Sequence, residues 1–430
     1  MEQPFGIKFL IVGGGIVGLA TAIALRRSGH GVILLEAKAE FKEVGAGIQV
    51  PPNCTKIFRK WKILDRLGEY ASSPNAIELR SYHGDVLSTT DLQDFERIFG
   101  APYLVVHRAD LLRVLLEEAR LMGTEIFTDA PVQQINFDTP SVRTKNGREY
   151  VADVIIGADG EHSICRQALF GHQPQRIIPL GKIAYRFHLP SEAILANPAL
   201  THLASPGKVT SWLGPQTHVV AYSLDAKGTF NVVAGLPETN HTMPTGPHLT
   251  TPEPLQKNFH DWDPALQELL KLADVCLAWN LMVYPELESL EWIHPNGKFT
   301  LIGDAAHAMP PHLAQGAAQG VEDAVFLGEL CSRMRSVQDV PQLLQVFQAK
   351  RRERVNAIKR RSLEVGRVWA LANGPEQEER DKLFKDGEAG IFRNRPHPNP
   401  FSDPGFASWL YGIDVFQEAN VAWGEMVIAE

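Results

Sequence analysis

Two glycine-rich segments, almost the whole chain apart, carry the residue types that suit ligand chemistry. Near the start, GGGIVG at residues 13–18 follows an apolar run, and Glu36 ends the next apolar run. Near residue 300, FTLIGDAAHAMPPHLAQGAAQGVEDA places Asp304 at the end of an apolar run, with a glycine-alanine run after it. Glycines let a backbone approach a pyrophosphate, helix N-termini attract anions, and carboxylates accept hydrogen bonds from hydroxyls. Together the segments predict one long ligand that carries both phosphate and hydroxyl groups.

The first glycine-rich segment has the surroundings of a βαβ unit. Residues 7–12 form a β-type run, 19–28 a helical pattern, and 31–35 a second buried strand that ends at Glu36. A glycine motif alone is weak, but this order of strand, helix and acid is typical of a dinucleotide site, in which the acid meets a ribose diol. We therefore expect the uncharged stretch 9–25 to be strand, turn and helix, not a signal peptide or a membrane span.

The strand pattern returns late in the chain, so the nucleotide-binding domain is predicted to be discontinuous. Residues 150–158 and 298–303 indicate further buried strands. The segment 179–282 between them has aromatics, prolines and alternating apolar residues, which predict an inserted antiparallel sheet. The clearest strands are at 208–213, 218–224 and 229–234. The predicted boundaries are 1–75, 102–178 and 283–371 for the nucleotide domain, 76–101 and 179–282 for the sheet domain, and 372–430 for an irregular and helical C-terminal segment.

Helices and loops outside these domains' strands have their own signals. Asp110 is a plausible N-cap for the helical pattern that runs to residue 121. Residues 339–371 predict a long polar helix, and we expect its basic run 350–354 to lie on a solvated face. The segment 374–405, rich in proline, glycine and charge, is expected to be irregular.

Composition limits the class of protein. The formal charge is −8, with 44% hydrophobic and 21% charged residues, values of a globular enzyme with no preference for nucleic acid. The four cysteines (Cys54, Cys165, Cys276 and Cys331) form no CxxC pair. They are expected to be reduced thiols in the cytoplasm, not a disulfide or metal framework. We expect no membrane span, and the oligomeric state, monomer or homodimer, stays open.

Four motifs occur in a fixed order: GGGIVG…E, HRADL, GADGEHSICR and GDAAHAMPPHLAQGAAQGVEDA. This order resembles the FAD-dependent aromatic hydroxylases, the single-component flavoprotein monooxygenases, over residues 7–370. GAGIQVPPN at 45–53 and AQGAAQGVEDA at 314–324 resemble the salicylate-hydroxylase branch, which includes fungal enzymes of secondary metabolism. The resemblance implies an α/β fold like that of para-hydroxybenzoate hydroxylase: a Rossmann-like FAD-binding domain with an inserted antiparallel sheet, an α+β insert, for the substrate.

The resemblance also implies residue roles. Glycines at the motif positions would approach FAD, Glu36 would bind its ribose, and Arg108 would offset phosphate charge near the ribityl chain. Asp159 would support the cofactor region, although Asp159-Gly160 could also be only a strand-ending turn. Asp304 would bind the ribityl chain, and the backbone after it would line the flavin ring. The cofactor set is Gly13, Gly15, Gly18, Glu36, Gly47, Arg108, Asp159, Asp304, Pro311, Gly316 and Ala317.

In this family NADPH or NADH reduces FAD, O2 adds at flavin C4a, and the hydroperoxide passes one oxygen atom to an electron-rich ring. The implied reaction is therefore hydroxylation, with or without dearomatisation or rearrangement, of an electron-rich aromatic, indole or polyketide-type molecule. No second GxGxxG unit for NAD(P)H is present in the sequence, which fits a family that docks this co-substrate transiently. Candidates facing the substrate are Arg186, Tyr222 and His312, with Tyr185 and His218 as further options; His307 is expected to be structural.

Two other functions remain open at this point. A flavin oxidase or dehydrogenase could use the same fold without substrate-stimulated consumption of NAD(P)H. A flavin-binding module without chemistry is the second alternative, and it would be indicated by a purified protein that takes up no FAD.

Overall fold

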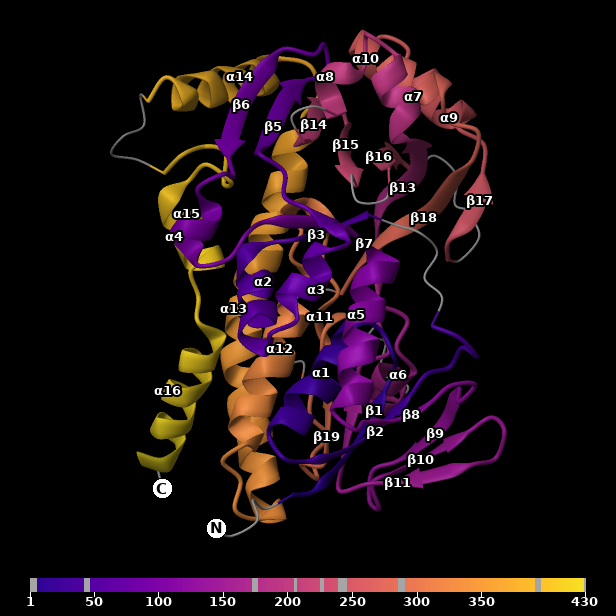
Figure 1. The fold of residues 1–430 in the computed structure, drawn as a ribbon, viewed down its shortest axis with the longest axis vertical. Helices are drawn as coiled ribbons and strands as arrows, with labels where there is room; N and C mark the ends of the chain where they lie inside the picture. The colour runs from indigo at the N-terminus through magenta and orange to yellow at the C-terminus, as the bar shows by residue number, and fades with distance from the viewer. Residues whose placement is uncertain are drawn as a thin grey trace.

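The computed structural model describes residues 6–41, 47–171, 177–204, 207–224, 228–238, 246–284, 291–390 and 396–428. In Figure 1 the parallel strands and their helices form the lower half of the molecule, and a second sheet with its own helices forms the upper half. The long helix α13 (Val340–Trp369) runs along both halves.

The lower half is built on a parallel sheet of apolar strands. Leu10, Ile11 and Ile155 are fully buried in it, as expected for strands covered on both faces. In the described chain its order is β19-β12-β1-β2-β8, with every neighbouring pair parallel. The strands are β1 (Lys8–Val12), β2 (Gly31–Leu35), β8 (Glu125–Phe127), β12 (Val154–Gly157) and β19 (Phe299–Leu301).

Two smaller sheets flank this one. The predicted strand 150–158 is in fact two strands in different sheets, β11 and β12, because residues 152 and 153 separate them. Among the described strands, the small sheets have the orders β11-β10-β9 and β3-β7-β4. Their strands are β9 (Val132–Asn136), β10 (Ser141–Thr144), β11 (Glu149–Val151), β3 (Gly47–Val50), β4 (Ala71–Ser72) and β7 (Leu104–His107).

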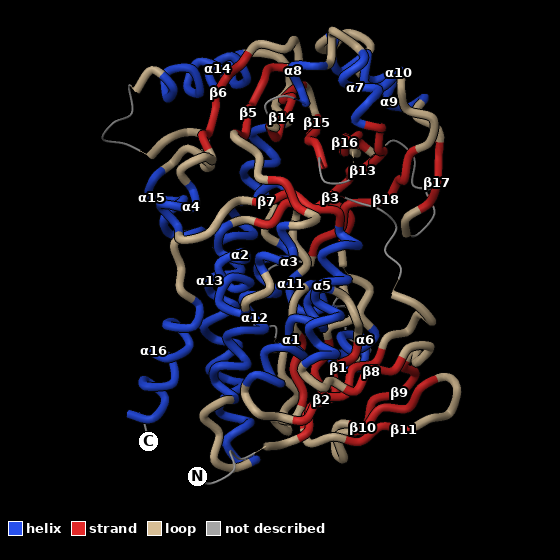
Figure 2. The backbone as a smooth tube through the Cα atoms, in the orientation of Figure 1, coloured by secondary structure: helices blue, strands red, loops and turns tan. Residues whose placement is uncertain are grey.

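The upper half is a large sheet, antiparallel except where β5 pairs with β14. Its described order is β17-β18-β13-β16-β15-β14-β5-β6, and Figure 2 shows its strands above the parallel sheet. The three strands expected near 208, 218 and 229 are confirmed. The strands are β5 (Ala76–Ser81), β6 (Val86–Asp91), β13 (Ile178–Pro190), β14 (Lys208–Gly214), β15 (Thr217–Leu224), β16 (Thr229–Pro237), β17 (His248–Thr250) and β18 (Cys276–Val283).

Helices cover these sheets. The tight packing of α1 on the first glycine loop needs Gly18, because a Cβ there would lie 1.9 Å from the Gly13 carbonyl oxygen. The helices up to the end of the large sheet are α1 (Ile16–Arg27), α2 (Pro52–Trp61), α3 (Leu64–Gly68), α4 (Phe95–Phe99), α5 (Arg108–Leu121), α6 (Ile164–Phe170), α7 (Ser191–Ala196), α8 (Thr201–Ala204), α9 (Glu253–Asn258) and α10 (Pro264–Lys271). Those after it are α11 (Asp304–His307), the 3-10 turn η2 (Pro311–Leu313), α12 (Gly316–Cys331), the 3-10 turn η3 (Val337–Asp339), α13, α14 (Pro375–Glu388), α15 (Pro404–Tyr411) and α16 (Val415–Ile428).

The fold class is confirmed: an α/β nucleotide-type domain carries a separate, mainly antiparallel sheet. The exact domain boundaries stay a prediction, although β5 and β6 do join the same sheet as β13–β18. The prediction that Asp110 caps α5 is wrong. His107 is the N-cap, its Nδ1 accepting a hydrogen bond from the Ala109 N–H at 3.3 Å, and Asp110 lies inside the first turn.

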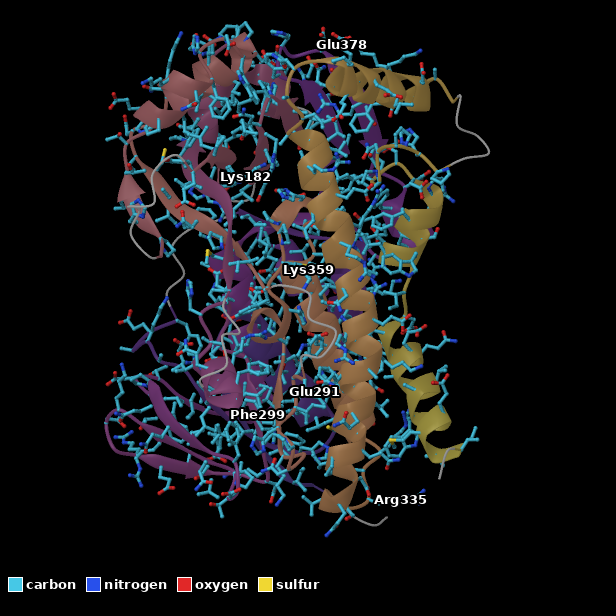
Figure 3. All side chains as sticks on the ribbon, turned by 180° about the vertical axis from the view of Figure 1, so that it is seen from behind. Lys182, Glu291, Phe299, Arg335, Lys359 and Glu378 are labelled. Carbon is cyan, nitrogen blue, oxygen red and sulfur yellow. The ribbon has the colours of Figure 1, made fainter. Side chains whose placement is uncertain are left out.

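Two expectations for the C-terminal third are also wrong. Residues 375–388 form α14, which packs against β6, so tertiary contact outweighs the low apolar content of this segment. The basic run of α13 is not uniformly solvated, because Arg351 is only 2% exposed. Figure 3 shows why: α13 lies against the body of the protein along its length, with Lys359 midway.

Candidate functional site

Two cavities meet between the parallel sheet and the large sheet. The larger has a volume of about 580 Å³ and the smaller about 290 Å³. They share part of their walls, so a ligand in one borders a ligand in the other. The shared residues are Gln49, Arg108, Gly160, Arg186, Tyr222, Asp304, Met309, Pro311 and Ala314.

The smaller cavity lies at the carboxyl end of β1, where the first glycine motif begins. Gly15 lines it, and a Cβ on Gly15 would meet nothing within 4 Å, so the backbone there faces open space. Gly13 and Gly18 instead serve packing: a Cβ on Gly13 would lie 2.4 Å from the Ala158 carbonyl oxygen. The first motif therefore gives Gly15 to the cavity wall, Gly13 to the close approach of the chain after β12, and Gly18 to the close approach of α1.

Glu36 and Asp159 hold the backbone beside this cavity. Glu36 accepts hydrogen bonds from the Gly14 N–H at 2.9 Å and the Lys38 N–H at 2.8 Å. Asp159 accepts from the Ser163 hydroxyl and from the Cys165 N–H, which fixes the start of α6. The structure thus favours the turn-forming role for Asp159, whereas Glu36 stands directly at the glycine loop.

Asp304 lines both cavities from the end of β19. Its side chain is exposed to them, and within the described residues its carboxylate accepts no hydrogen bond. Gly303 before it has φ of +60°, a backbone conformation that glycine adopts readily. The Gly303 N–H donates to Asp323 Oδ2 at 3.2 Å, so the strand end is tied to α12.

A buried network of charged groups supports Asp304 from behind. His307 Nε2 lies 2.5 Å from Asp323 Oδ2, and Arg351 Nε donates to Asp323 Oδ1 at 2.6 Å. Arg351 also donates to Glu322 at 2.8 Å, as does Arg354. Burial raises the pKa of both carboxyls, but the cations around them outweigh it and lower each pKa to about 2. His307 is therefore structural here, with its ring 2% exposed.

The N-terminus of α12 points backbone groups at the smaller cavity. Pro311, Gly316 and Ala317 all line it, and no side chain caps the helix at Gln315. The first N–H groups of a helix carry partial positive charge and suit an electron-rich ligand edge. Gly47 lines the same cavity from β3, and it must be small, because a Cβ there would lie 2.8 Å from the Tyr222 ring.

The large sheet turns one face toward the larger cavity. Along β13, Lys182, Ala184 and Arg186 line the cavity, whereas Tyr185 between them is buried in the core on the other face. The period of two in a strand explains this division. Tyr185 is accordingly excluded from the cavity wall. The other strands contribute Val209, Ser211, His218, Val220, Tyr222, Val233, Gly235, Leu277, Trp279 and Leu281.

Arg186 and Tyr222 lie where the cavities meet. The Arg186 guanidinium carbon is 5.2 Å from the Trp279 ring centroid, and its buried Nε finds no hydrogen-bond partner in the described part of the chain. Burial, opposed by Tyr222 and reinforced by Arg108, lowers the pKa of Arg186. Burial raises the pKa of Tyr222 to about 12, with Arg186 opposing it. Tyr222 is thus a neutral hydroxyl beside a buried cation that lacks full compensation.

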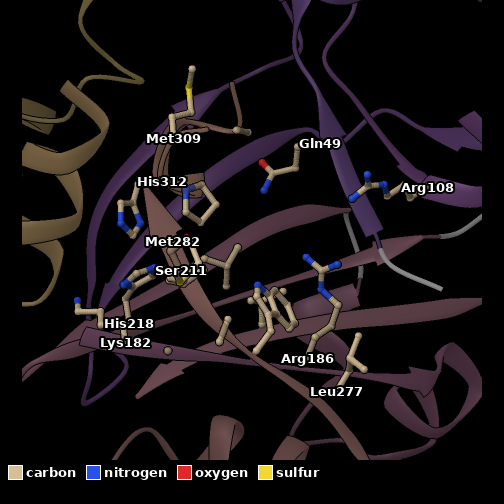
Figure 4. Close-up of a pocket in the computed structure, with 18 of the residues that line it drawn as sticks. Gln49, Arg108, Lys182, Arg186, Ser211, His218, Leu277, Met282, Met309 and His312 are labelled. Atoms are coloured by element: carbon tan, nitrogen blue, oxygen red, sulfur yellow. The ribbon is translucent and has the colours of Figure 1, made fainter. Parts of the chain in front are cut away.

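His312 and His218 lie together in the larger cavity, with ring centroids 5.0 Å apart. Burial and, to a lesser degree, Lys182 lower the pKa of His312 to about 3, and burial also lowers the pKa of His218. Both imidazoles are therefore neutral at neutral pH. Figure 4 shows them on one side of the cavity and Arg186 and Arg108 on the other.

Some lining residues were not anticipated from the sequence. Lys182 precedes Arg186 by four residues on the same strand, and that alternation was the available signal. The ring centroids of Trp369, at the end of α13, and Phe401 are 6.2 Å apart, and both residues line the larger cavity. Nothing in the local pattern around Phe401 indicated this contact, because it depends on how the chain returns to the sheet.

The smaller cavity offers groups that suit parts of FAD. They are the open backbone at Gly15, an uncapped helix N-terminus at Gly316, and the Asp304 carboxylate, which has no hydrogen-bond partner among the described residues. A family model described as "FAD binding domain" matches residues 7–218 and 294–362. FAD-dependent monooxygenase OpS4 of Beauveria bassiana is 35% identical, over 97% of both chains.

The chain belongs to the family of FAD-dependent monooxygenases. A further relative, 3-amino-4-hydroxybenzoate 2-monooxygenase PtnB3 of Streptomyces platensis, is 32% identical over 95% of this chain and 96% of its own. A solved salicylate hydroxylase in complex with substrate has a TM-score of 0.77 and 25% identity, and the match covers 98% of each chain. The predicted family, enzyme class and FAD cofactor of this monooxygenase are thereby confirmed.

The described part of the monooxygenase shows neither a membrane-spanning helix nor a metal-binding cluster. None of the helices in the described ranges is long and apolar enough to cross a membrane. In the same part of the chain, no three or more His, Cys, Asp or Glu side chains lie together so that they could hold a metal ion.

Proposed function

We propose that this monooxygenase uses FAD, O2 and NADH or NADPH to hydroxylate an electron-rich aromatic small molecule. The observation that carries the proposal is the shared wall: the cavity with the groups that suit FAD opens at Arg186 and Tyr222 onto a second cavity lined by both apolar and charged side chains. Such juxtaposition suits transfer between a cofactor and an aromatic ring. The relative PtnB3 is a 3-amino-4-hydroxybenzoate 2-monooxygenase, and 3-amino-4-hydroxybenzoate is an aromatic molecule of this kind.

When bound, reduced FAD would supply the activated oxygen, and the chain's residues would prepare the ring. The buried cation of Arg186 stabilises a phenolate over a phenol, which makes the ring more electron-rich. Tyr222, neutral at its raised pKa, can donate a hydrogen bond to that oxygen. The apolar strand residues around them exclude water. His312, a neutral imidazole, can donate or accept one hydrogen bond on the substrate's other side.

The cofactor roles form part of the same proposal. Gly15 and the α12 N-terminus with Gly316 would meet the pyrophosphate and the flavin ring edge, and Asp304 would accept from ribityl hydroxyls. Arg108 would offset phosphate charge, and Glu36 would accept from the adenosine ribose. Pro311, Ala317 and Gly47 would shape the ring site, whereas Gly13, Gly18 and Asp159 hold the backbone around it.

Two features outside the site support the proposed compartment and the proposed use of NADH or NADPH. The four cysteines are buried and unpaired, which fits a reducing compartment such as the cytoplasm. NADH or NADPH would dock transiently at the open side of the cavities, since the sequence holds one glycine-rich dinucleotide motif near its start.

The test is substrate-stimulated oxidation of NADH and NADPH by purified holoenzyme over a panel of phenols, indoles and hydroxybenzoates. We expect at least one compound to accelerate loss of the nicotinamide absorbance band and to gain one oxygen atom that derives from isotopically labelled O2. A protein that oxidises the compound and releases hydrogen peroxide without NADH or NADPH would instead be an oxidase, which would overturn the proposal.

A further inference from the structure

Three nitrogen-bearing side chains gather in a part of the larger cavity that the FAD cavity does not share. Lys182 comes from β13, His218 from β15 and His312 from η2. All three line the larger cavity and none lines the smaller one. Figure 4 shows them on the side opposite Arg186 and Arg108. We call Lys182, His218 and His312 the basic cluster.

The basic cluster has hydrogen-bonding capacity that the chain does not use. Nδ1 of His218 and Nδ1 of His312 are buried and have no hydrogen-bond partner among the residues that the structure describes. Within the described residues, the Lys182 ammonium has neither an ion pair nor a hydrogen bond, and burial lowers its pKa. Leaving a buried polar atom unsatisfied costs folding free energy. Two unsatisfied imidazole nitrogens beside an ammonium without an ion pair in the described chain indicate that a ligand supplies their partners.

Packing against the rest of the protein fixes the positions of the His218 and His312 rings. A Cβ on Gly366 would lie 2.2 Å from His312 Nε2, so the α13 backbone holds that ring. The His218 ring centroid lies 5.4 Å from that of Trp369, edge to face at 74°. The cluster is therefore built into the fold in advance of any ligand, which lowers the cost of binding one.

The charge around the cluster is positive. The acidic side chains that line the larger cavity are Glu161 and Asp304, within the described residues. Asp304 also lines the FAD cavity, and burial together with the nearby Asp304 carboxylate raises the pKa of Glu161. Both acids thus belong to the cofactor side. An anionic ligand group beside Lys182 would meet its cation in a desolvated wall, where charge-assisted hydrogen bonds are strongest.

We propose that Lys182, His218 and His312 form a carboxylate-binding subsite for the substrate. This inference rests on the proposed function. It makes the substrate a hydroxylated aromatic acid whose carboxylate lies on the side of the ring away from Arg186. Lys182 supplies the charge, and each neutral imidazole supplies one N–H donor. A cavity of about 580 Å³ is ample for one ring with an acid group or a short acid side chain.

The experiment compares acids with their uncharged amides as ligands of the oxidised holoenzyme. Binding is followed by the perturbation of flavin absorbance, so neither NAD(P)H nor turnover is needed. The probes are 4-hydroxybenzoate, 3-(4-hydroxyphenyl)propanoate and 4-hydroxycinnamate, each with its primary amide. We expect at least one acid to bind wild-type protein about tenfold or more tightly than its amide, since each tenfold corresponds to about 1.4 kcal/mol.

The variants assign that preference to the cluster. Lys182→Met should weaken the acid about 10- to 100-fold and change the amide less than about twofold, whereas Lys182→Arg should retain most of the preference. His312→Phe and His218→Phe, which keep ring volume but remove the donors, should weaken the acid by smaller factors. Lys257→Met, at an exposed lysine of α9, is the matched control for lost charge and should change nothing.

Three results would overturn the subsite. The first is that Lys182→Met weakens binding of the acid and of its amide equally. The second is that the wild-type protein prefers none of the acids over its amide. The third is that Arg186→Met loses the preference for the acid whereas Lys182→Met keeps it. The last would place the carboxylate at Arg186. Failure of the proposed function looks different: the acids would bind with the predicted preference but never be hydroxylated. Flavin content and Tm of each variant show that it has folded.

Discussion

Replacing Arg351 by methionine tests the buried charge network that supports the FAD site. Arg351 donates to Asp323 at 2.6 Å and to Glu322 at 2.8 Å, and all three side chains are essentially buried. Methionine keeps much of the apolar stem but removes the cation. Glu322 then retains Arg354, and Asp323 retains His307, so each carboxylate is left with only part of its compensation.

The expected loss follows from the cost of an uncompensated buried charge. Removing one partner of a buried ion pair typically costs about 3–5 kcal/mol. Unfolding entropy is about 2.1 cal/mol/K per residue, which over 430 residues gives about 0.9 kcal/mol/K. The melting temperature should therefore fall by about 3–6 °C. Because Asp323 also accepts from the Gly303 N–H, retention of FAD should weaken as well.

The assay is thermal unfolding of purified variants with and without added FAD, together with the flavin-to-protein ratio. Lys350→Met is the matched control on the preceding residue of α13. Its ion pair with Glu425 is exposed, with side chains 45% and 58% accessible, and exposed pairs contribute about 0–1 kcal/mol. If Arg351→Met melts within a degree of Lys350→Met and holds as much FAD, the network does not stabilise the site.

Other predictions concern the cofactor, the substrate and acid stability. Asp304→Ala should fold with an unchanged apoprotein melting temperature but low flavin content, because it removes the ribityl acceptor; normal flavin occupancy would refute this. Arg186→Ala should keep its flavin and raise KM or uncouple NAD(P)H oxidation from hydroxylation, and unchanged coupling would exclude Arg186 as an anchor. The pKa of Glu322 falls from 4.5, and that of Asp323 from 3.8, to about 2 on folding, so their stabilisation is complete above about pH 4.5 and is lost as pH falls toward 2. Melting temperatures across that range should drop, less steeply in Glu322→Gln, and parallel curves would contradict the assignment.

Local sequence patterns predicted the flavin half of the proposed site. The glycine loop, Glu36, Asp304 and the α12 N-terminus each lie within a few residues of a strand end or helix start, and such positions are set by chain-local geometry. Alternation along β13 makes the neighbours Arg186 and Tyr185 face opposite ways, so the two could not both face the substrate as predicted. It did not show which face meets the cavity, because a strand's two faces are distinguished only by what packs on them.

Contacts between distant segments were beyond the sequence. The basic run of α13 matched a solvated face by composition, yet Arg351 is buried because α12 presents Glu322 and Asp323 at the same level. The segment around Phe401 was expected to be irregular and was given no role, but Phe401 packs near Trp369 and lines the larger cavity with it. His107, not Asp110, caps α5, because β7 ends at His107 and the helix begins at the next residue.

The sequence by itself determined that this is a flavin-binding α/β monooxygenase, since each cofactor motif is a short segment whose strand, turn and helix carry their own signals. Only the tertiary structure decided which side chains share the substrate cavity and which cations are buried. Lys182, His218 and His312 come from separate elements, and their proximity depends on strand order and on the docking of η2 against α13. No local pattern encodes that proximity, because it arises from packing over the whole chain.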